Sequence, residues 1–260
     1  MNNQVLESYR ILGQKRVGKT SIVKTFQSEL ESFEKVIVVY VEGNNDNDYN
    51  KTYENLILDL EDQFQDAIEN IADDLLREKL QNVEFEPNRY DLDMLNRYIK
   101  KILRIDRKLK IVIILDEFDS LNDEFFNPMT LGKSFSLALG KKIGANRNVA
   151  LVLVGSENMQ LTNNITNYNG FERIQVDFFD KATQYIEFEK LVRNPVKPYL
   201  EYTSSAILKI YEACEGNPYF ANLICAELFK ICKSKLEYRI EEIHVENVIE
   251  ELIKKGETEQ

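Results

Sequence analysis

The stretch "ILGQKRVGKTSIV", residues 11–23, constrains the fold of this chain more than any other feature. It contains the pattern G-x-x-x-x-G-K-[ST], with Gly13, Gly18, Lys19 and Thr20 at the required spacing. The glycines let the backbone fold tightly enough for its N–H groups to surround a phosphate, and the helix that follows adds the positive end of its dipole. The pattern therefore predicts a phosphate-binding loop between a strand and a helix.

The flanking residues fit that context. "YRIL" (9–12) is a short apolar strand candidate, and "KTSIVKTFQSEL" (19–30) has the periodicity of an amphipathic helix. We expect the loop to bind ATP or ADP. Lys19 should reach the β- and γ-phosphates of ATP as a catalytic group, and the Thr20 hydroxyl should ligate Mg²⁺. The expected nucleotide-binding residues of the loop are Gly13, Gln14, Lys15, Arg16, Val17, Gly18, Lys19, Thr20 and Ser21.

Four more apolar runs have strand length and alternate with helical patterns. The runs are residues 35–43, 110–121, 148–159 and 170–179, and helices are expected around residues 53–75 and 92–103. Strands that alternate with helices form a doubly wound parallel sheet, whose ligands lie at the carboxyl ends of the strands. The predicted fold class is therefore α/β, a P-loop NTPase sheet with helices on both faces.

The pattern changes after about residue 180, where strand signals stop and helical periodicity continues. "GNPYFANLICAELFKIC" (216–232) predicts a helix with Asn217 as its N-cap and Pro218 at the first helical position. We expect two domains, a P-loop ATPase core over residues 1–180 and a small helical or winged-helix-like domain over residues 181–260.

The second chemical signal is an acidic pair at the end of "KIVIILDEFDSL". Asp116 is expected to hold Mg²⁺, usually through water, and Glu117 to orient and deprotonate the water that attacks the γ-phosphate. Acids after a strand can also form only a turn, but after a matched P-loop the catalytic interpretation is favoured. An adjacent glutamate favours a water-activating ATPase over a small-molecule kinase or a GTPase.

Two further residues are catalytic candidates. Ser156 follows the apolar run 148–155 and is placed to hydrogen-bond the γ-phosphate or the lytic water, with Asn158 as the competing choice. Ser156 could instead be an ordinary turn residue. Arg173 could supply positive charge to the transition state or sense the nucleotide, or it could form a surface salt bridge.

The overall charge bears on partners. The chain has 33 Lys and Arg against 44 Asp and Glu, a formal charge of −11, which disfavours DNA binding unless basic residues gather on one face. Its three cysteines contain no C-x-x-C pair and are typical of a reducing compartment, and three cysteines with one histidine offer few ligands for structural zinc. No signal peptide or membrane-spanning run is recognisable, so we expect a cytoplasmic protein without membrane partners.

These motifs, together with "LVRNPVKPYLEYTSSAILKIYEACEGNPYFANLICAEL" (191–228), resemble the STAND-type P-loop NTPases, in the branch close to archaeal-type and origin-recognition ATPases of the AAA+ group. The resemblance implies that Pro218, in the Gly-x-Pro element 216–218, packs on the nucleotide. Relatives also have a helix and a Gly-Arg element before the first strand, and effector and sensor domains outside the ATPase. Either the base is held differently in this chain or the sequence is a fragment.

The resemblance implies a switch module that binds ATP and hydrolyses it slowly, in which the nucleotide controls domain arrangement and homo-oligomerisation. It also implies a role in signalling, with defence signalling as one possibility. Two alternatives stay open. One is a DNA-associated ATPase of the origin-recognition or transposition type, for which the basic clusters 104–110 and 230–239 are candidates. The other is a non-hydrolysing scaffold that holds ADP permanently.

Overall fold

The structure of the protein is a computed structural model, which describes residues 6–43, 52–85, 92–121, 125, 135, 138–157, 170–235 and 238–258. The chain forms two compact units, one made of residues 1–14 and 19–176 and the other of residues 15–18 and 177–260. The domain boundary expected between residues 180 and 181 stays a prediction. Among the described residues, no helix combines the length and the apolar character needed to cross a bilayer.

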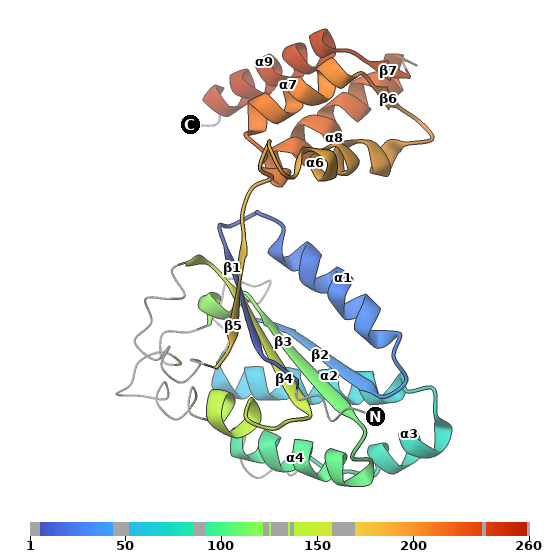
Figure 1. The fold of residues 1–260 in the computed structure, drawn as a ribbon, viewed down its shortest axis with the longest axis vertical. Helices are drawn as coiled ribbons and strands as arrows, with labels where there is room; N and C mark the ends of the chain where they lie inside the picture. The colour runs from blue at the N-terminus through green and yellow to red at the C-terminus, as the bar shows by residue number, and fades with distance from the viewer. Residues whose placement is uncertain are drawn as a thin grey trace. The chain divides into compact units, whose positions relative to one another are not determined.

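The first unit is built on a five-stranded, fully parallel sheet (Figure 1). In chain order its strands are β1 (Tyr9–Gly13), β2 (Val36–Glu42), β3 (Lys110–Asp116), β4 (Val149–Gly155) and β5 (Glu172–Val176). Their order across the sheet is β2-β3-β4-β1-β5, so β1 lies between the last two strands to be added. The order reverses beside β1, and in open α/β sheets ligands bind at the carboxyl ends of the strands at such a point. The predicted P-loop α/β fold is confirmed.

Alternation along the strands divides the apolar residues between the two faces of the sheet. Ile111, Ile113 and Leu115 face a large core that also contains α2 (Tyr53–Glu69), α3 (Asp74–Gln81) and α4 (Leu92–Ile105). Val112 and Ile114 face the opposite way, toward α1 (Lys19–Glu31). Helices therefore cover both faces, as a parallel sheet with apolar strands requires.

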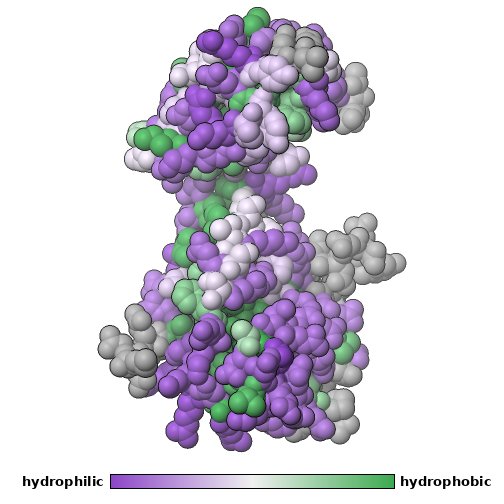
Figure 2. Space-filling model, turned by 90° about the vertical axis from the view of Figure 1, so that its right-hand side faces the viewer, coloured by the Kyte–Doolittle hydropathy of each residue, from purple (hydrophilic) through white to green (hydrophobic). Residues whose placement is uncertain are grey.

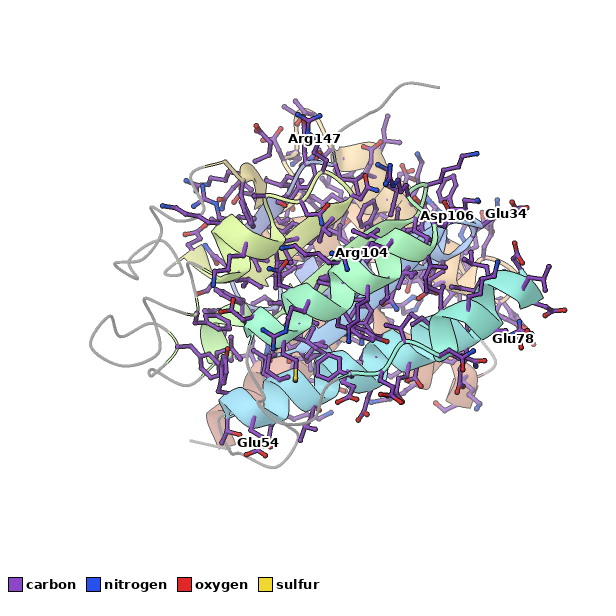
Figure 3. All side chains as sticks on the ribbon, turned by 90° about the horizontal axis from the view of Figure 1, so that it is seen from below. Glu34, Glu54, Glu78, Arg104, Asp106 and Arg147 are labelled. Carbon is purple, nitrogen blue, oxygen red and sulfur yellow. The ribbon has the colours of Figure 1, made fainter. Side chains whose placement is uncertain are left out.

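The outer sides of the helices on the larger face carry charge. Figure 3 shows this face from below, with Glu54, Glu78 and Arg104 labelled on α2, α3 and α4, and all three side chains are exposed. On the face that Figure 2 presents, hydrophilic residues predominate and hydrophobic ones form small groups. The charged helix faces are thus solvated surface.

Several predicted elements end earlier in the structure than the apolar runs do. β3 stops at Asp116 because Glu117 has a left-handed backbone and is the N-cap of the short 3₁₀-helix η1 (Phe118–Ser120). β4 stops at Gly155, and β5 covers only five residues. The single helix expected over residues 53–75 is two helices in the structure. α2 ends at Glu69, and Asp73 caps the start of α3, in which Leu75 is exposed. The π-helix η3 (Ala138–Ile143) precedes β4.

The second unit is mainly helical and has its own core. It contains α6 (Tyr185–Arg193), the 3₁₀-helix η6 (Asn194–Val196), α7 (Ser204–Cys214), α8 (Pro218–Lys235) and α9 (Glu242–Thr258). Two short strands, β6 (Glu201–Tyr202) and β7 (Arg239–Ile240), pair in parallel. The sequence does not predict these strands, because two residues are too few to show an alternating pattern.

Candidate functional site

The loop between β1 and α1 has the backbone that the motif requires. Arg16 and Gly18 have positive φ angles of 65° and 99°. A Cβ added at Gly18 meets no described atom within 4 Å, so glycine is needed there for the backbone conformation and not for space. Val17 is buried, while Gln14, Lys15 and Arg16 are exposed. Backbone N–H groups in such a turn, at the start of a helix, form an anion-binding concavity.

Lys19 is the first residue of α1, and its side chain folds back over this loop. Its ammonium donates hydrogen bonds to the carbonyl oxygens of Gly13, at 2.8 Å, and Gln14, at 2.7 Å. Thr20 and Ser21 follow in the first turn of α1, with Thr20 half-buried and Ser21 exposed. The ammonium therefore lies beside the loop that is expected to surround the phosphates.

Asp116 is the last residue of β3 and is only 2% exposed. Its Oδ1 accepts a hydrogen bond from the Glu117 N–H at 2.8 Å, and its Oδ2 accepts one from the Tyr40 hydroxyl at 2.9 Å. Burial, followed by the nearby Asp116 charge, raises the pKa of Tyr40, so its hydroxyl remains a donor at neutral pH. A buried carboxylate with a donor on each oxygen has a fixed orientation.

Glu117 is exposed and has a left-handed backbone, with φ 49° and ψ 39°. This conformation costs a residue with a side chain about 1–2 kcal/mol, and such strain is concentrated at functional sites. Close packing accompanies it, since a Cβ atom added to Gly43 would lie 2.4 Å from the Glu117 carbonyl oxygen. The Gly43 N–H also donates to the Asp116 carbonyl oxygen at 2.7 Å. The end of β2 therefore fixes the backbone of the acidic pair.

The two remaining catalytic candidates in the sheet, Ser156 and Arg173, lie at different positions along the strand direction. Ser156, half-buried, directly follows β4, whose Gly155 is level with Leu12 of β1. Ser156 thus lies at the same edge of the sheet as the loop and the acidic pair. Arg173 is exposed and pairs with Arg10, so it lies roughly 10 Å from the level of Gly13, toward the start of β5. Its guanidinium donates a hydrogen bond to the Gln175 side chain at 2.8 Å. Asn158 lies outside the described residues.

Pro218 belongs to the second unit, where it is the first residue of α8. The Asn217 side chain accepts a hydrogen bond from the Tyr219 N–H at 2.9 Å, which confirms the predicted N-cap. Gly216, before it, has φ 78° and approaches Phe179 so closely that a Cβ would lie 2.2 Å from the Phe179 carbonyl oxygen. The Gly-Asn-Pro element is therefore a tightly packed helix start within the second unit.

The oxygen atoms at this edge of the sheet fit Mg²⁺. The ion prefers carboxylate, hydroxyl and phosphate oxygens, and proteins usually hold it through one or two carboxylates together with nucleotide phosphates. Asp116 supplies a buried carboxylate and Thr20 a hydroxyl at the start of the loop helix. This donor set matches the predicted roles of both residues, which stay predictions.

Sequence reasoning missed three residues at the end of β2, namely Tyr40, Glu42 and Gly43. Residues 40 and 42 alternate with the apolar positions of the run 35–43 and share the face of the sheet that carries Asp116. A tyrosine and a glutamate two residues apart, just before a glycine, were the available signal. Only the pairing of β2 with β3 brings them next to the acidic pair.

Comparison with protein families shows which family the chain belongs to. A model of an ATPase domain found predominantly in Archaea matches residues 2–223. The chain belongs to this family. The P-loop, the acidic pair and the parallel sheet of this archaeal-type ATPase are therefore parts of a nucleotide-binding ATPase domain. No curated protein matches the chain.

Two proteins of known structure illustrate the similarity of fold. The ORC2 protein of Aeropyrum pernix, in its ADPNP–ADP complexes, has a TM-score of 0.65 and 13% identity, and the match covers 96% of this chain and 63% of that one. The RuvB Holliday junction branch migration motor of Thermotoga maritima has a TM-score of 0.54 and 16% identity, and the match covers 95% and 62%. The archaeal-type ATPase thus spans less than two thirds of either protein.

Proposed function

We propose that the chain is an ATP-binding switch module of the STAND type that hydrolyses ATP slowly or when a partner triggers it. The observation that carries its ATP-binding and hydrolytic part is that β1, where the phosphate-binding loop begins, ends at the same edge of the sheet as Asp116 and Glu117. Those three features are the minimum for binding a nucleoside triphosphate and activating water against it. The STAND type and the slow or triggered turnover rest on the resemblance.

Each group then has one task. The loop N–H groups and the Lys19 ammonium bind the phosphates, and Thr20 and Asp116 hold Mg²⁺. Bound Mg²⁺ neutralises charge that develops on the phosphate oxygens during transfer. The exposed Glu117 carboxylate orients a water and accepts its proton, while Ser156 donates a hydrogen bond to the γ-phosphate or to that water.

The proposal extends to the second unit and to other chains. We propose that Pro218 packs on the nucleotide, that the nucleotide controls the arrangement of the two units, and that the module assembles into homo-oligomers or works with effector and sensor domains. The resemblance in the region 191–228 supports these points. Arg173 keeps its two proposed roles, a catalytic charge or a surface partner, and its distance from the edge of the sheet favours the second.

Equilibrium binding of a fluorescent ATP analogue tests the site. Lys19→Ala should bind the analogue about 10- to 100-fold more weakly, because a charge-assisted contact to phosphate contributes roughly 1.5–3 kcal/mol. Glu117→Gln should bind as the wild type does, since Glu117 acts on water. The control Glu34→Gln changes an exposed glutamate just before β2, at the other end of the sheet. Equal binding by Lys19→Ala and the wild type would refute the site.

A second candidate is a DNA-associated ATPase of the origin-recognition type, favoured by the folds of the two neighbours named above. Charge opposes it, because residues 177–260 contain eleven Lys and Arg against sixteen Asp and Glu. Fluorescence anisotropy with a labelled duplex separates the candidates. Binding with a steep salt dependence supports the DNA role, and its absence at low salt supports the switch. A non-hydrolysing ADP scaffold is the third candidate, and it predicts stabilisation by ADP without turnover.

A further inference from the structure

The hydroxyl of Tyr40 lies between two carboxylates at the end of β2. Its oxygen is 2.9 Å from Oδ2 of Asp116 on the neighbouring strand and 2.9 Å from Oε1 of Glu42 on its own strand. The parallel pairing explains the geometry, because β2 and β3 place Glu42 level with Asp116 and Tyr40 level with Ile114. Tyr40 and Glu42 therefore share one face of the sheet with the buried acid.

A tyrosine hydroxyl has one hydrogen, so it cannot donate fully to both carboxylates. Lys24 provides Glu42 with a second partner, since its ammonium is 3.3 Å from Oε1 of Glu42 and 5.3 Å from the centre of the Tyr40 ring. Asp116 is the more deeply buried of the two carboxylates, and a buried carboxylate loses more than an exposed one when a donor is missing. The Tyr40 hydrogen is therefore directed to Asp116.

Lys24 connects this cluster to the phosphate-binding loop. It lies on α1 four residues after Thr20, so the two side chains emerge from the same side of the helix one turn apart. A continuous series of contacts then runs from α1 through Lys24, Glu42 and Tyr40 to Asp116. It joins the two elements that carry the proposed Mg²⁺ ligands.

We propose that Tyr40 is a positioning residue for the Mg²⁺ site, holding the Asp116 carboxylate in its binding orientation while Glu42 and Lys24 link it to the loop helix. This inference rests on the proposed function, because it takes Asp116 as a Mg²⁺ ligand. Partners that orient a metal ligand commonly contribute 10- to 100-fold to metal affinity when they are removed.

The test measures binding of a fluorescent ADP analogue while Mg²⁺ is titrated, and again in EDTA. Tyr40→Phe removes only the hydroxyl and keeps the ring. We expect unchanged affinity in EDTA and about a tenfold rise in the Mg²⁺ concentration that gives half of the Mg²⁺-dependent effect. Lys24→Gln should show a smaller rise in the same direction, since it acts through Glu42. Circular dichroism and thermal melting check that the variants are folded.

Two variants make the result interpretable. Tyr9→Phe is the matched control, since the Tyr9 hydroxyl donates to Glu7 near the start of β1, and this variant should behave as the wild type. Asp116→Asn should lose most of the Mg²⁺ dependence. If Tyr40→Phe keeps the wild-type Mg²⁺ dependence while Asp116→Asn loses it, the positioning role is wrong and the proposed function stands.

Other outcomes are equally decisive. If Tyr40→Phe lowers the affinity for the ADP analogue equally with Mg²⁺ and in EDTA, Tyr40 has a general structural role, and the inference is overturned. If Asp116→Asn retains the full Mg²⁺ dependence, the metal role within the proposed function fails first. If Tyr40→Phe is unfolded, Lys24→Gln is the deciding variant. Wild-type Mg²⁺ dependence in folded Lys24→Gln then overturns the inference.

Discussion

At the scale of single residues, the acidic pair depends on a residue that has no side chain. Gly43 has an ordinary φ, so what it requires is space and not a special conformation. The backbone of Glu117 occupies that space and is itself held in the left-handed region. A methyl group at position 43 must therefore displace the backbone of Glu117.

Gly43→Ala should reduce phosphate release from ATP at least about tenfold while changing nucleotide affinity little, because the displaced residue acts on water. Overpacking should also lower the free energy of unfolding by roughly 1–3 kcal/mol. Gly170→Ala is the matched control, since a Cβ there meets no atom of the described residues within 4 Å, and it should match the wild type. Normal turnover in Gly43→Ala would show that Glu117 tolerates displacement or is not the base.

The sequence predicts the residues of the phosphate-binding loop but not the roles of Tyr40 and Gly43. The spacing of Gly13, Gly18 and Lys19 is local, so the chain itself reveals it, and the structure has the positive φ angles that the motif demands. The roles of Tyr40 and Gly43 depend on which strand lies beside β2. That contact spans 76 residues between Tyr40 and Asp116, and no local pattern encodes it.

At the scale of elements, the start of α8 is secured by its N-cap. Asn217 is only 8% exposed, and its side chain accepts the Tyr219 N–H, which otherwise has no partner within the helix. The residue directly before the cap, Gly216, packs closely against the backbone of Phe179.

Asn217→Ala should lower the free energy of unfolding of the second unit by about 1 kcal/mol, measured by urea denaturation. Asn222→Ala, at an exposed position in the same helix, should be neutral or slightly stabilising, since alanine has the higher helix propensity. Equal effects of the two substitutions would contradict the capping role.

An ion pair connects the start of β2 to the end of α4. Lys35 donates to Oδ2 of Asp106 at 2.6 Å, and this hydrogen bond, with one from the Lys108 N–H, holds the pKa of Asp106 below its usual value. A carboxyl group whose pKa is lower in the folded state stabilises the fold above its unfolded pKa, and this contribution is lost as the pH falls through the folded pKa.

Asp106→Asn should therefore lower the urea midpoint at pH 7, and the difference from the wild type should shrink below about pH 4, where the unfolded Asp takes up a proton. The measurement is a series of urea denaturation curves from pH 3 to pH 7. A difference that stays constant over this range would mean that the Asp106 charge is not responsible.

Element boundaries were harder to predict than element types. All five sheet strands were expected from their apolar runs, yet β3 and β4 are shorter than those runs. Leu121 is apolar and buried, as a strand residue would be, but it follows η1 instead of extending β3. Hydrophobicity reports burial, whereas the strand ends where Glu117 changes the backbone direction.

At the scale of the whole molecule, the nucleotide is proposed to act as a structural switch. Two units with separate cores permit rearrangement without unfolding either core. Small-angle scattering should therefore differ between the wild type with ADP and Glu117→Gln with Mg-ATP, which is expected to retain the triphosphate. Identical curves in the two states would contradict the switch and favour the scaffold.

The measurement that tests the central claim most directly is phosphate release from Mg-ATP, per chain, over a range of protein concentrations, with Glu117→Gln beside the wild type. We expect slow release that rises per chain with concentration, as assembly completes the site, and that falls at least about 100-fold in the variant. Release from Glu117→Gln equal to that from the wild type would contradict the assignment of Glu117 as the base, and nucleotide binding without release at any concentration would contradict the hydrolytic switch.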